Sequence, residues 1–256
     1  MAGVKPLMLE VINVNKTFDG FQAVSDVRLR VEKGQVVAVI GPNGAGKTTL
    51  FDLITGQLAP DSGRILFQGE DITGRKPHLI FRKGISRSYQ IVNIFHRLTV
   101  FENVQIAVLS FQKKSFHWYG AARKMAGAET RAILKSVGLA DKADQISGFL
   151  SHGDQKVLEI AIALGNEPQL LILDEPTAGM SPEETGHSLT LLKRLCADHG
   201  STILFCEHDM GMVFSFAHEI MVMQQGKTIV QSTPAEVRSD PRVQAAYLGG
   251  ADECSG

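Results

Sequence analysis

The chain carries two kinds of hydrophobic pattern, and each predicts a different type of strand. Residues 8–14 and 27–31 alternate apolar and polar side chains, which is typical of antiparallel strands with one solvated face. Residues 36–40, 170–173 and 202–206 are continuous apolar runs, which indicate strands buried on both faces, as in a parallel sheet. The sequence therefore predicts an antiparallel β part near the start of the chain and a mainly parallel sheet.

Helical signals lie between these strands. A helix is predicted over residues 47–56, which end in glycine. A second is predicted over 181–200, because Ser181 and Pro182 offer a cap and a first-turn proline, with Glu184 at the capping-box position. A strand, a helix and a strand in this order favour a parallel α/β sheet with flanking helices.

Strand signals fade between about residues 92 and 164, where helix-forming residues dominate, as in 129–135. We interpret this stretch as an α-helical subdomain inserted into a single domain of 256 residues. Residues 1–91 and 165–256 would then form the core around it.

The segment Gly41-Pro-Asn-Gly-Ala-Gly-Lys-Thr-Thr49 follows the predicted strand 36–40 and leads into a predicted helix. It fits G-x-x-x-x-G-K-[ST], the P-loop pattern, in the context that this motif requires. Glycines let successive N–H groups point at one anion, and the helix N-terminus faces the same phosphates. Lys47 can reach the β- and γ-phosphates, and Thr48 can ligate Mg²⁺. A glycine-rich turn with a chance Lys-Thr pair is the alternative. The predicted ATP-binding residues here are Gly41, Pro42, Asn43, Gly44, Ala45, Gly46, Lys47, Thr48 and Thr49.

Two carboxylates, Asp174 and Glu175, follow the apolar run 170–173. Buried acids are costly unless they are paired or bind a metal, and the carboxyl ends of parallel strands face ligands. We therefore expect Asp174 to hold Mg²⁺ and Glu175 to polarise the attacking water. The alternative is an acid at the start of a helix.

Composition adds few constraints. A net charge of −1 argues against a strongly basic nucleic-acid surface, so no nucleic-acid partner is expected. The three cysteines form no Cys-x-x-Cys pair, which fits a reducing compartment. Neither a signal peptide nor a long apolar run is present, so work at a membrane would be that of a peripheral subunit.

The segment Leu150-Ser-His-Gly-Asp-Gln155, followed by 156–161, resembles the signature motif of ATP-binding cassette proteins. Together with the P-loop, the run 174–177, Gln90 and His208, it spans nearly the whole chain in the order of that family. The chain resembles the ATPase subunit of an ATP-binding cassette (ABC) transporter.

This resemblance implies roles for further residues. Phe18 would stack on adenine, with core packing as the alternative. Gln90 would contact Mg²⁺ or the attacking water, and His208 would touch the γ-phosphate. Ser151 and Gly153 would face the ATP held by a second ATPase protomer, identical or different, so that ATP completes the interface between the two.

Three positions depart from the family pattern. His152 replaces a glycine of the signature and adds bulk. Asp154 replaces a neutral glutamine and would weaken an anion site unless it points away. Ser181 stands where the family often has an aspartate, and it has a structural role available as a helix cap.

The segments 98–104 and 243–249 look like those of ATPases that power import of branched-chain amino acids, urea or amides. The alternative is the related ATPase of lipopolysaccharide extraction. An importer implies two transmembrane permease subunits, indirectly a solute-binding protein, and a place at the cytoplasmic face of the inner or plasma membrane. A cassette acting on DNA or ribosomes would need a coiled coil, a second cassette or basic stretches.

A groove near residues 91–110 is expected to receive a short helix of the permease. The candidate contacts are Ile91, Ile94 and Phe95, and their alternative is the core of the helical subdomain.

Overall fold

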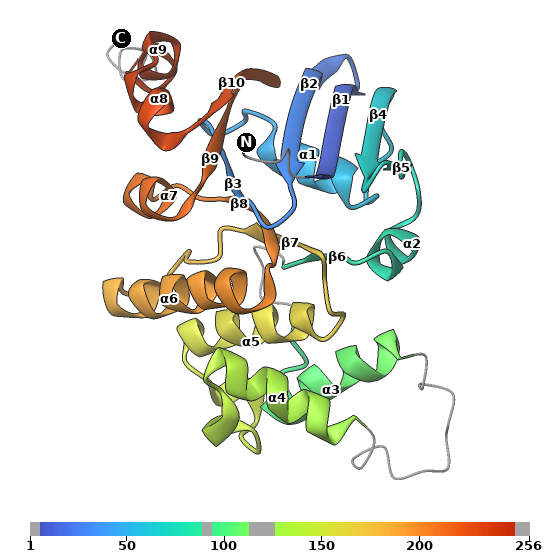
Figure 1. Cartoon of the computed structure of the whole chain (residues 1–256), viewed down its shortest axis with the longest axis vertical. Coiled ribbons are helices and arrows are strands. Elements are labelled where there is room, and N and C mark those ends of the chain that lie inside the picture. The colour runs from blue at the N-terminus through green and yellow to red at the C-terminus, as the bar shows by residue number, and fades with distance from the viewer. Residues whose placement is uncertain (1–5, 89–93, 113–125, 249–256) are drawn as a thin grey trace.

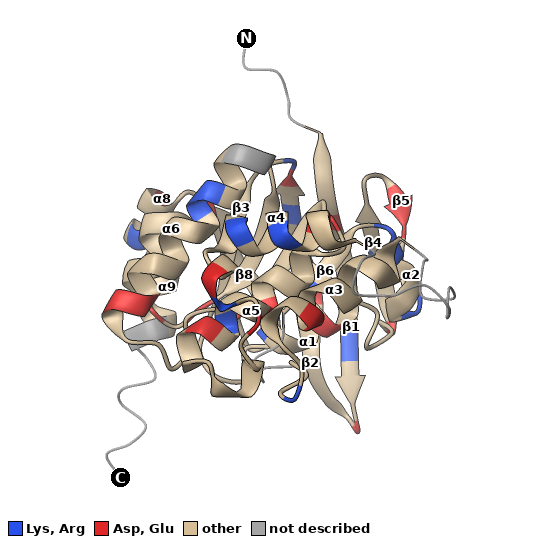
Figure 2. Cartoon of the chain, turned by 90° about the horizontal axis from the view of Figure 1, so that it is seen from below, with Lys and Arg blue, Asp and Glu red and all other residues tan. Residues whose placement is uncertain are grey.

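The computed structural model describes residues 6–88, 94–112 and 126–248, and these residues build two β-sheets with helices around them (Figure 1). Among the described helices, none is both long and apolar enough to cross a bilayer. Seen from below, basic and acidic residues are interspersed over the described elements (Figure 2).

The smaller sheet has four antiparallel strands in the order β2-β1-β4-β5. The first two strands are longer than their alternating patterns predicted, because they continue to a tight turn at Asp19 and Gly20, whose φ angles are 44° and 88°. Positive φ at both central residues suits the right-handed twist of a hairpin. The strands are β1 (Leu7–Phe18), β2 (Phe21–Glu32), β4 (Ser62–Phe67) and β5 (Glu70–Asp71).

The larger sheet has six strands in the order β10-β9-β3-β8-β7-β6. Its neighbours pair in parallel except for β9 and β10, which turn on each other through Gln225 and Gly226, both at positive φ. The predicted parallel strands are confirmed as β3, β7 and β8. The six strands are β3 (Val36–Ile40), β6 (Ile85–Arg87), β7 (Leu170–Asp174), β8 (Thr202–Cys206), β9 (Glu219–Gln224) and β10 (Lys227–Ser232).

The packing of the core accounts for the unbroken apolar runs of the central strands. Val36, Ala38 and Ile40 of strand β3 pack into a hydrophobic cluster that includes residues of the helices between β6 and β7. Val37 and Val39 point to a second cluster, shared with the four-stranded sheet and α1. Because side chains alternate between the two faces of a strand, a sheet buried on both faces needs apolar residues at every position.

The helices cover the larger sheet. Between β6 and β7, the described residues form the helices α3, α4 and α5 and two short 3₁₀ turns, and they include no named strand. These helices lie at the end of the molecule opposite the four-stranded sheet (Figure 1). The predicted α-helical insertion is therefore present in the fold. The helices are α1 (Lys47–Ile54), α2 (Pro77–Arg82), α3 (Val100–Phe111), α4 (Gly127–Val137), α5 (His152–Leu164), α6 (Pro182–His199), α7 (Met210–Phe216), α8 (Pro234–Ser239) and α9 (Pro241–Leu248).

Helix α6 begins as its sequence predicted. The Ser181 hydroxyl accepts a hydrogen bond from the Glu184 N–H at 3.3 Å, and the Glu184 carboxylate accepts one from the Ser181 N–H at 2.9 Å. The helix ends at Gly200, which has φ 59°. Ser181 is thus engaged as a helix cap.

Candidate nucleotide-binding site

A cavity of about 370 Å³ lies where the glycine-rich loop leaves β3 and enters α1. The loop, the acidic end of β7, the end of β8 and the start of β2 all contribute to it, although they are distant in the sequence. Its lining residues are Phe21, Ala23, Asn43, Gly44, Ala45, Gly46, Lys47, Thr48, Thr49, Glu175, Cys206 and His208.

The loop needs its glycines where it enters α1. Gly46 has φ 97°, and a β-carbon there would lie 2.5 Å from the carbonyl oxygen of Ala23. Gly44 has φ 77° with open space beside it. A left-handed backbone and a close approach of two chain segments both favour glycine. The loop therefore turns its backbone toward the cavity without side chains in the way.

Lys47, the first residue of α1, is buried with its ammonium against the loop. Its Nζ donates hydrogen bonds to the carbonyl oxygens of Gly41 at 2.7 Å and Pro42 at 3.1 Å. Burial lowers the pKa of Lys47, and the neighbouring groups Cys206, Glu175 and Asp174 oppose this shift. An anion bound in the cavity would likewise stabilise the charged lysine.

Asp174 ends β7 as a buried carboxylate whose two oxygens both accept hydrogen bonds. Oδ2 accepts one from Arg87 Nη2 at 2.9 Å, and Oδ1 accepts one from the Cys206 thiol at 2.9 Å. Burial, followed by the nearby charge of Asp174, raises the pKa of Cys206, so this thiol stays protonated and able to donate. These contacts fix the orientation of the carboxylate.

Glu175 and His208, predicted from separate parts of the sequence, lie together. His208 Nε2 is 3.0 Å from Glu175 Oε1, and both residues line the cavity. Glu175 has φ 49°, a conformation that is uncommon for a residue with a side chain. Such backbone strain occurs often at functional sites, where the surrounding structure maintains it.

Sequence reasoning did not identify Glu207, which joins two loops at the site. Its buried carboxylate accepts hydrogen bonds from the N–H and the hydroxyl of Thr177, at 2.8 and 2.6 Å. It also accepts one from the His208 N–H at 3.1 Å. The segment after β7 is thereby tied to the segment after β8. The available signal was an acid directly after a buried strand, the same signal that identified Asp174.

The structure places two phenylalanines at the β1–β2 turn, of which the sequence singled out one. Phe18 is 38% exposed, and the Lys16 ammonium lies over its ring, with Nζ 5.6 Å from the ring centre. Phe21 pairs with Phe18 across the hairpin, is 68% exposed and lines the cavity. Phe21 is therefore an additional candidate for contact with a base.

Ser151 and Gly153 do not line this cavity. The Ser151 hydroxyl caps α5 by accepting a hydrogen bond from the Asp154 N–H at 3.1 Å. The Gly153 N–H donates a hydrogen bond to the Glu184 carboxylate. Hydrogen bonds from Ser181 lower the pKa of Glu184 most, and the bond from Gly153 lowers it further.

The departures in the signature have structural roles. The Asp154 carboxylate forms a salt bridge with Lys142, so the negative charge of Asp154 is paired with the ammonium of Lys142. The imidazole of His152 packs against Gly179, where a β-carbon would lie 3.0 Å from Nε2. Gln90 lies outside the described residues.

The residues present fit Mg²⁺ delivered with a nucleotide. Mg²⁺ prefers oxygen ligands and binds through one or two protein groups, substrate phosphates and waters. The hydroxyl of Thr48 and the carboxylate of Asp174 are donors of that kind, one at the start of α1 and one at the end of β7. Among the described residues, no group of three or more His, Cys, Asp or Glu could hold a metal ion by itself.

The fold and this site together define a P-loop nucleotide-binding domain with a helical insertion. The chain belongs to the ABC transporter family of ATP-binding cassettes, because the ABC transporter model matches residues 24–178. Residues 233–253 match a second model, described as branched-chain amino acid ATP-binding cassette transporter. The predicted family and ATPase class are confirmed.

Full-length relatives share the similarity. The chain is 40% identical over 251 residues to the high-affinity branched-chain amino acid transport ATP-binding protein BraF of Pseudomonas aeruginosa, covering 95% of this chain and 98% of BraF. It is 36% identical over 252 residues to the corresponding protein LivG of Escherichia coli K12, with the same coverage.

Solved structures show the same fold. The ADP conformation of MJ1267, an ATP-binding cassette of an ABC transporter, has a TM-score of 0.83 and 31% identity, covering 95% of this chain and 99% of that one. The dimeric cassette MJ0796, bound to ADP and Pi in a post-hydrolysis state, has a TM-score of 0.74 and 27% identity, covering 89% and 99%. The predicted fold class is confirmed.

Proposed function

We propose that this chain is the ATPase subunit of an importer for branched-chain amino acids or a related amide or urea. The observation that carries the proposal is its similarity to BraF over nearly the full length of both chains. The matching C-terminal segment points to the same group of transporters. Lipopolysaccharide extraction, the alternative from sequence, has no such support.

In this proposal, the predicted site residues have distinct parts in hydrolysis. The loop N–H groups and Lys47 bind the phosphates, with the positive end of α1 beneath them. Glu175 orients and deprotonates the attacking water, and His208, 3.0 Å away, holds the carboxylate and reaches toward the γ-phosphate. Mg²⁺, held by Thr48, Asp174 and Gln90, would neutralise charge on the phosphates.

The second half of the site comes from a second protomer in this proposal. Ser151 and the N-terminus of α5 would face the γ-phosphate held by the partner, where a hydroxyl and a helix dipole stabilise negative charge. ATP then closes the dimer because it binds the closed state better than the open one. Hydrolysis removes that preference, and the dimer reopens.

Replacement of Ser151 by arginine tests the shared site. Ser151 is exposed at the start of α5, so we expect Ser151→Arg to keep ATP binding in one protomer and to prevent ATP-dependent dimerisation by its bulk. ATP titration and size-exclusion chromatography of the full chain would measure the two properties. Ser239→Arg, an exposed position on α8, is the matched control. Dimerisation of Ser151→Arg with ATP would contradict the shared site.

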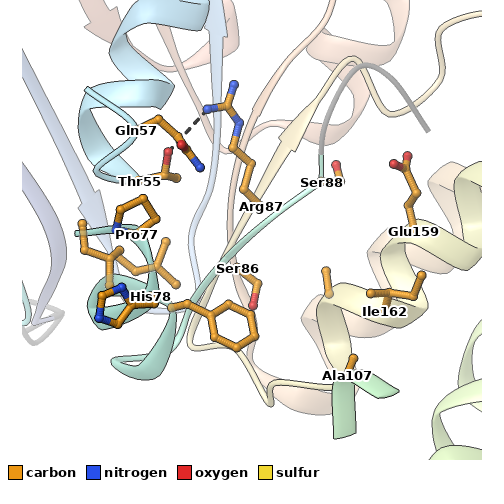
Figure 3. Close-up of a pocket in the computed structure, with 14 residues that line it drawn as sticks. Thr55, Gln57, Pro77, His78, Ser86, Arg87, Ser88, Ala107, Glu159 and Ile162 are labelled. Carbon is orange, nitrogen blue, oxygen red and sulfur yellow. Dashed lines mark hydrogen bonds between the residues drawn. The ribbon is translucent and has the colours of Figure 1, made fainter. Parts of the chain in front are cut away.

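A groove of about 410 Å³ between the core and the helical part is the proposed docking site for the permease (Figure 3). Its walls combine the end of α1, helix α2 and strand β6 on one side with α3 and α5 on the other. The lining residues are Thr55, Gln57, Pro77, His78, Ile80, Phe81, Ile85, Ser86, Arg87, Ser88, Ala107, Glu159, Ile162 and Ala163.

Neither Ile94 nor Phe95, which the sequence predicted as permease contacts, is among the residues that line this groove. Ile94 is only 8% exposed and packs into the core, so its prediction as an exposed contact is wrong. Phe95 is 58% exposed and remains a candidate. Ile91 lies outside the described residues. A permease bound here would place this chain at the cytoplasmic face of the membrane, as a peripheral subunit.

Uptake measurements test the proposed cargo. In cells that lack this chain, we expect ATP-dependent uptake of labelled leucine, isoleucine and valine to fall, and to return with the wild-type chain. Complementation with the Glu175→Gln variant should fail at equal protein level. Normal uptake of all three amino acids, and of urea and amides, in the deleted strain would contradict the importer assignment.

A further inference from the structure

Arg87 is a buried cation that joins three parts of the molecule. Its side chain is 4% exposed and extends from β6, the strand that borders the groove. Nη2 donates a hydrogen bond to Asp174 Oδ2 at 2.9 Å, and Nη1 donates one to Asp52 Oδ1 at 2.5 Å. The guanidinium also lies over the ring of Phe51, 5.7 Å from its centre.

The contacts of Arg87 connect the P-loop helix to the acidic strand end. Asp52 lies on α1, which starts with Lys47 and Thr48, and Asp174 ends β7. A planar guanidinium can hold two carboxylates at fixed angles, which a lysine ammonium cannot do. Arg87 therefore holds one oxygen of the Asp174 carboxylate, while the Cys206 thiol holds the other.

Arg87 also lines the groove, between Ser86 and Ser88 (Figure 3). In the same view its guanidinium turns toward Thr55 at the end of α1, whose hydroxyl accepts a hydrogen bond from Nη1 at 3.4 Å. A protein segment seated in the groove would contact the residue that holds Asp174.

We propose that Arg87 is a positioning residue for Asp174 that sets the affinity of the nucleotide site for Mg²⁺. The proposal rests on the proposed roles of Thr48 and Asp174 in Mg²⁺ binding. Partners of metal ligands orient those ligands, and their loss usually costs about 10- to 100-fold in metal affinity or activity. A cation fixed against Asp174 keeps this carboxylate in one orientation in the absence of metal.

The test compares nucleotide binding with and without Mg²⁺. A non-hydrolysable ATP analogue would be titrated into the full chain in excess Mg²⁺ and in EDTA. For Arg87→Lys we expect the affinity in EDTA to stay within about twofold of wild type, and the gain in affinity from Mg²⁺ to fall about tenfold. The Mg²⁺ concentration for half-maximal ATP hydrolysis should rise in parallel.

Arg82→Lys is the matched control, because Arg82 is an exposed arginine on the neighbouring helix α2. Should Arg87→Lys fail to fold, the double variant Arg87→Gln with Asp52→Asn removes the guanidinium without leaving the Asp52 charge behind. We expect the double variant to show the same loss of the Mg²⁺ effect.

The outcomes separate this inference from the proposed function. An Mg²⁺ effect in Arg87→Lys equal to that of wild type overturns the role of Arg87 and leaves the ATP site intact. A wild-type chain that binds the analogue equally in Mg²⁺ and EDTA overturns the metal role of Asp174 and this inference together. A wild-type chain that does not bind the analogue contradicts the proposed function itself.

Discussion

Glu175→Gln is expected to lower the turnover number for ATP hydrolysis by about 100-fold or more, while ATP still binds. The glutamine amide has nearly the size of the carboxylate but cannot accept the proton of the attacking water. The substitution leaves the P-loop sequence unchanged, because Glu175 directly follows β7, where its Oε1 lies 3.0 Å from His208 Nε2. Steady-state phosphate release and ATP titration would measure the two effects separately.

The comparison with Glu183→Gln controls for the loss of one negative charge. Glu183 is exposed in the first turn of α6 and does not line the cavity. We expect that variant to hydrolyse ATP at the wild-type rate. Wild-type turnover by Glu175→Gln would remove Glu175 from the role of general base.

Lys47→Ala is expected to weaken ATP binding by about 10- to 100-fold, or ~1.5–3 kcal/mol, the usual range for a hydrogen bond to a charged group. Lys47 is buried, and it is the lysine among the residues that line the cavity. Its removal leaves the loop N–H groups and the helix dipole, which retain part of the anion affinity.

Thermal unfolding without nucleotide would show whether Lys47→Ala is folded, since the variant also loses hydrogen bonds to Gly41 and Pro42. Lys33→Ala, in the exposed turn between β2 and β3, is the control and should bind ATP normally. An unchanged ATP titration curve for folded Lys47→Ala would contradict the proposed phosphate contact.

The sequence predicted the central sheet well because its strands are buried on both faces. An unbroken apolar run that ends in two acids, as in 170–175, is typical of a buried strand whose carboxyl end borders a site. Strand β6 was missed because it has three residues, Ile85–Arg87, and its middle position is a serine. Parallel pairing with β7 stabilises this short strand, which its own sequence pattern does not predict.

The site was predictable where one short motif carries the chemistry and was not where contacts are long-range. The loop 41–49 forms its phosphate cradle from neighbouring residues. The role of Arg87 depends on its hydrogen bonds to Asp52 and Asp174, which are 35 and 87 positions away in the sequence. Phe21 was missed because Phe18, on the other side of the same turn, matched the family pattern. No local signal distinguishes which of two facing rings borders a cavity.

The measurement that tests the central claim most directly is the isolation of this chain, tagged and intact, from its native membranes in mild detergent. The importer assignment predicts that two dissimilar multi-span permeases and a second ATPase accompany it. A permease pair for lipid extraction with this ATPase alone would contradict the importer assignment. The absence of any membrane protein would contradict its role as a transporter subunit.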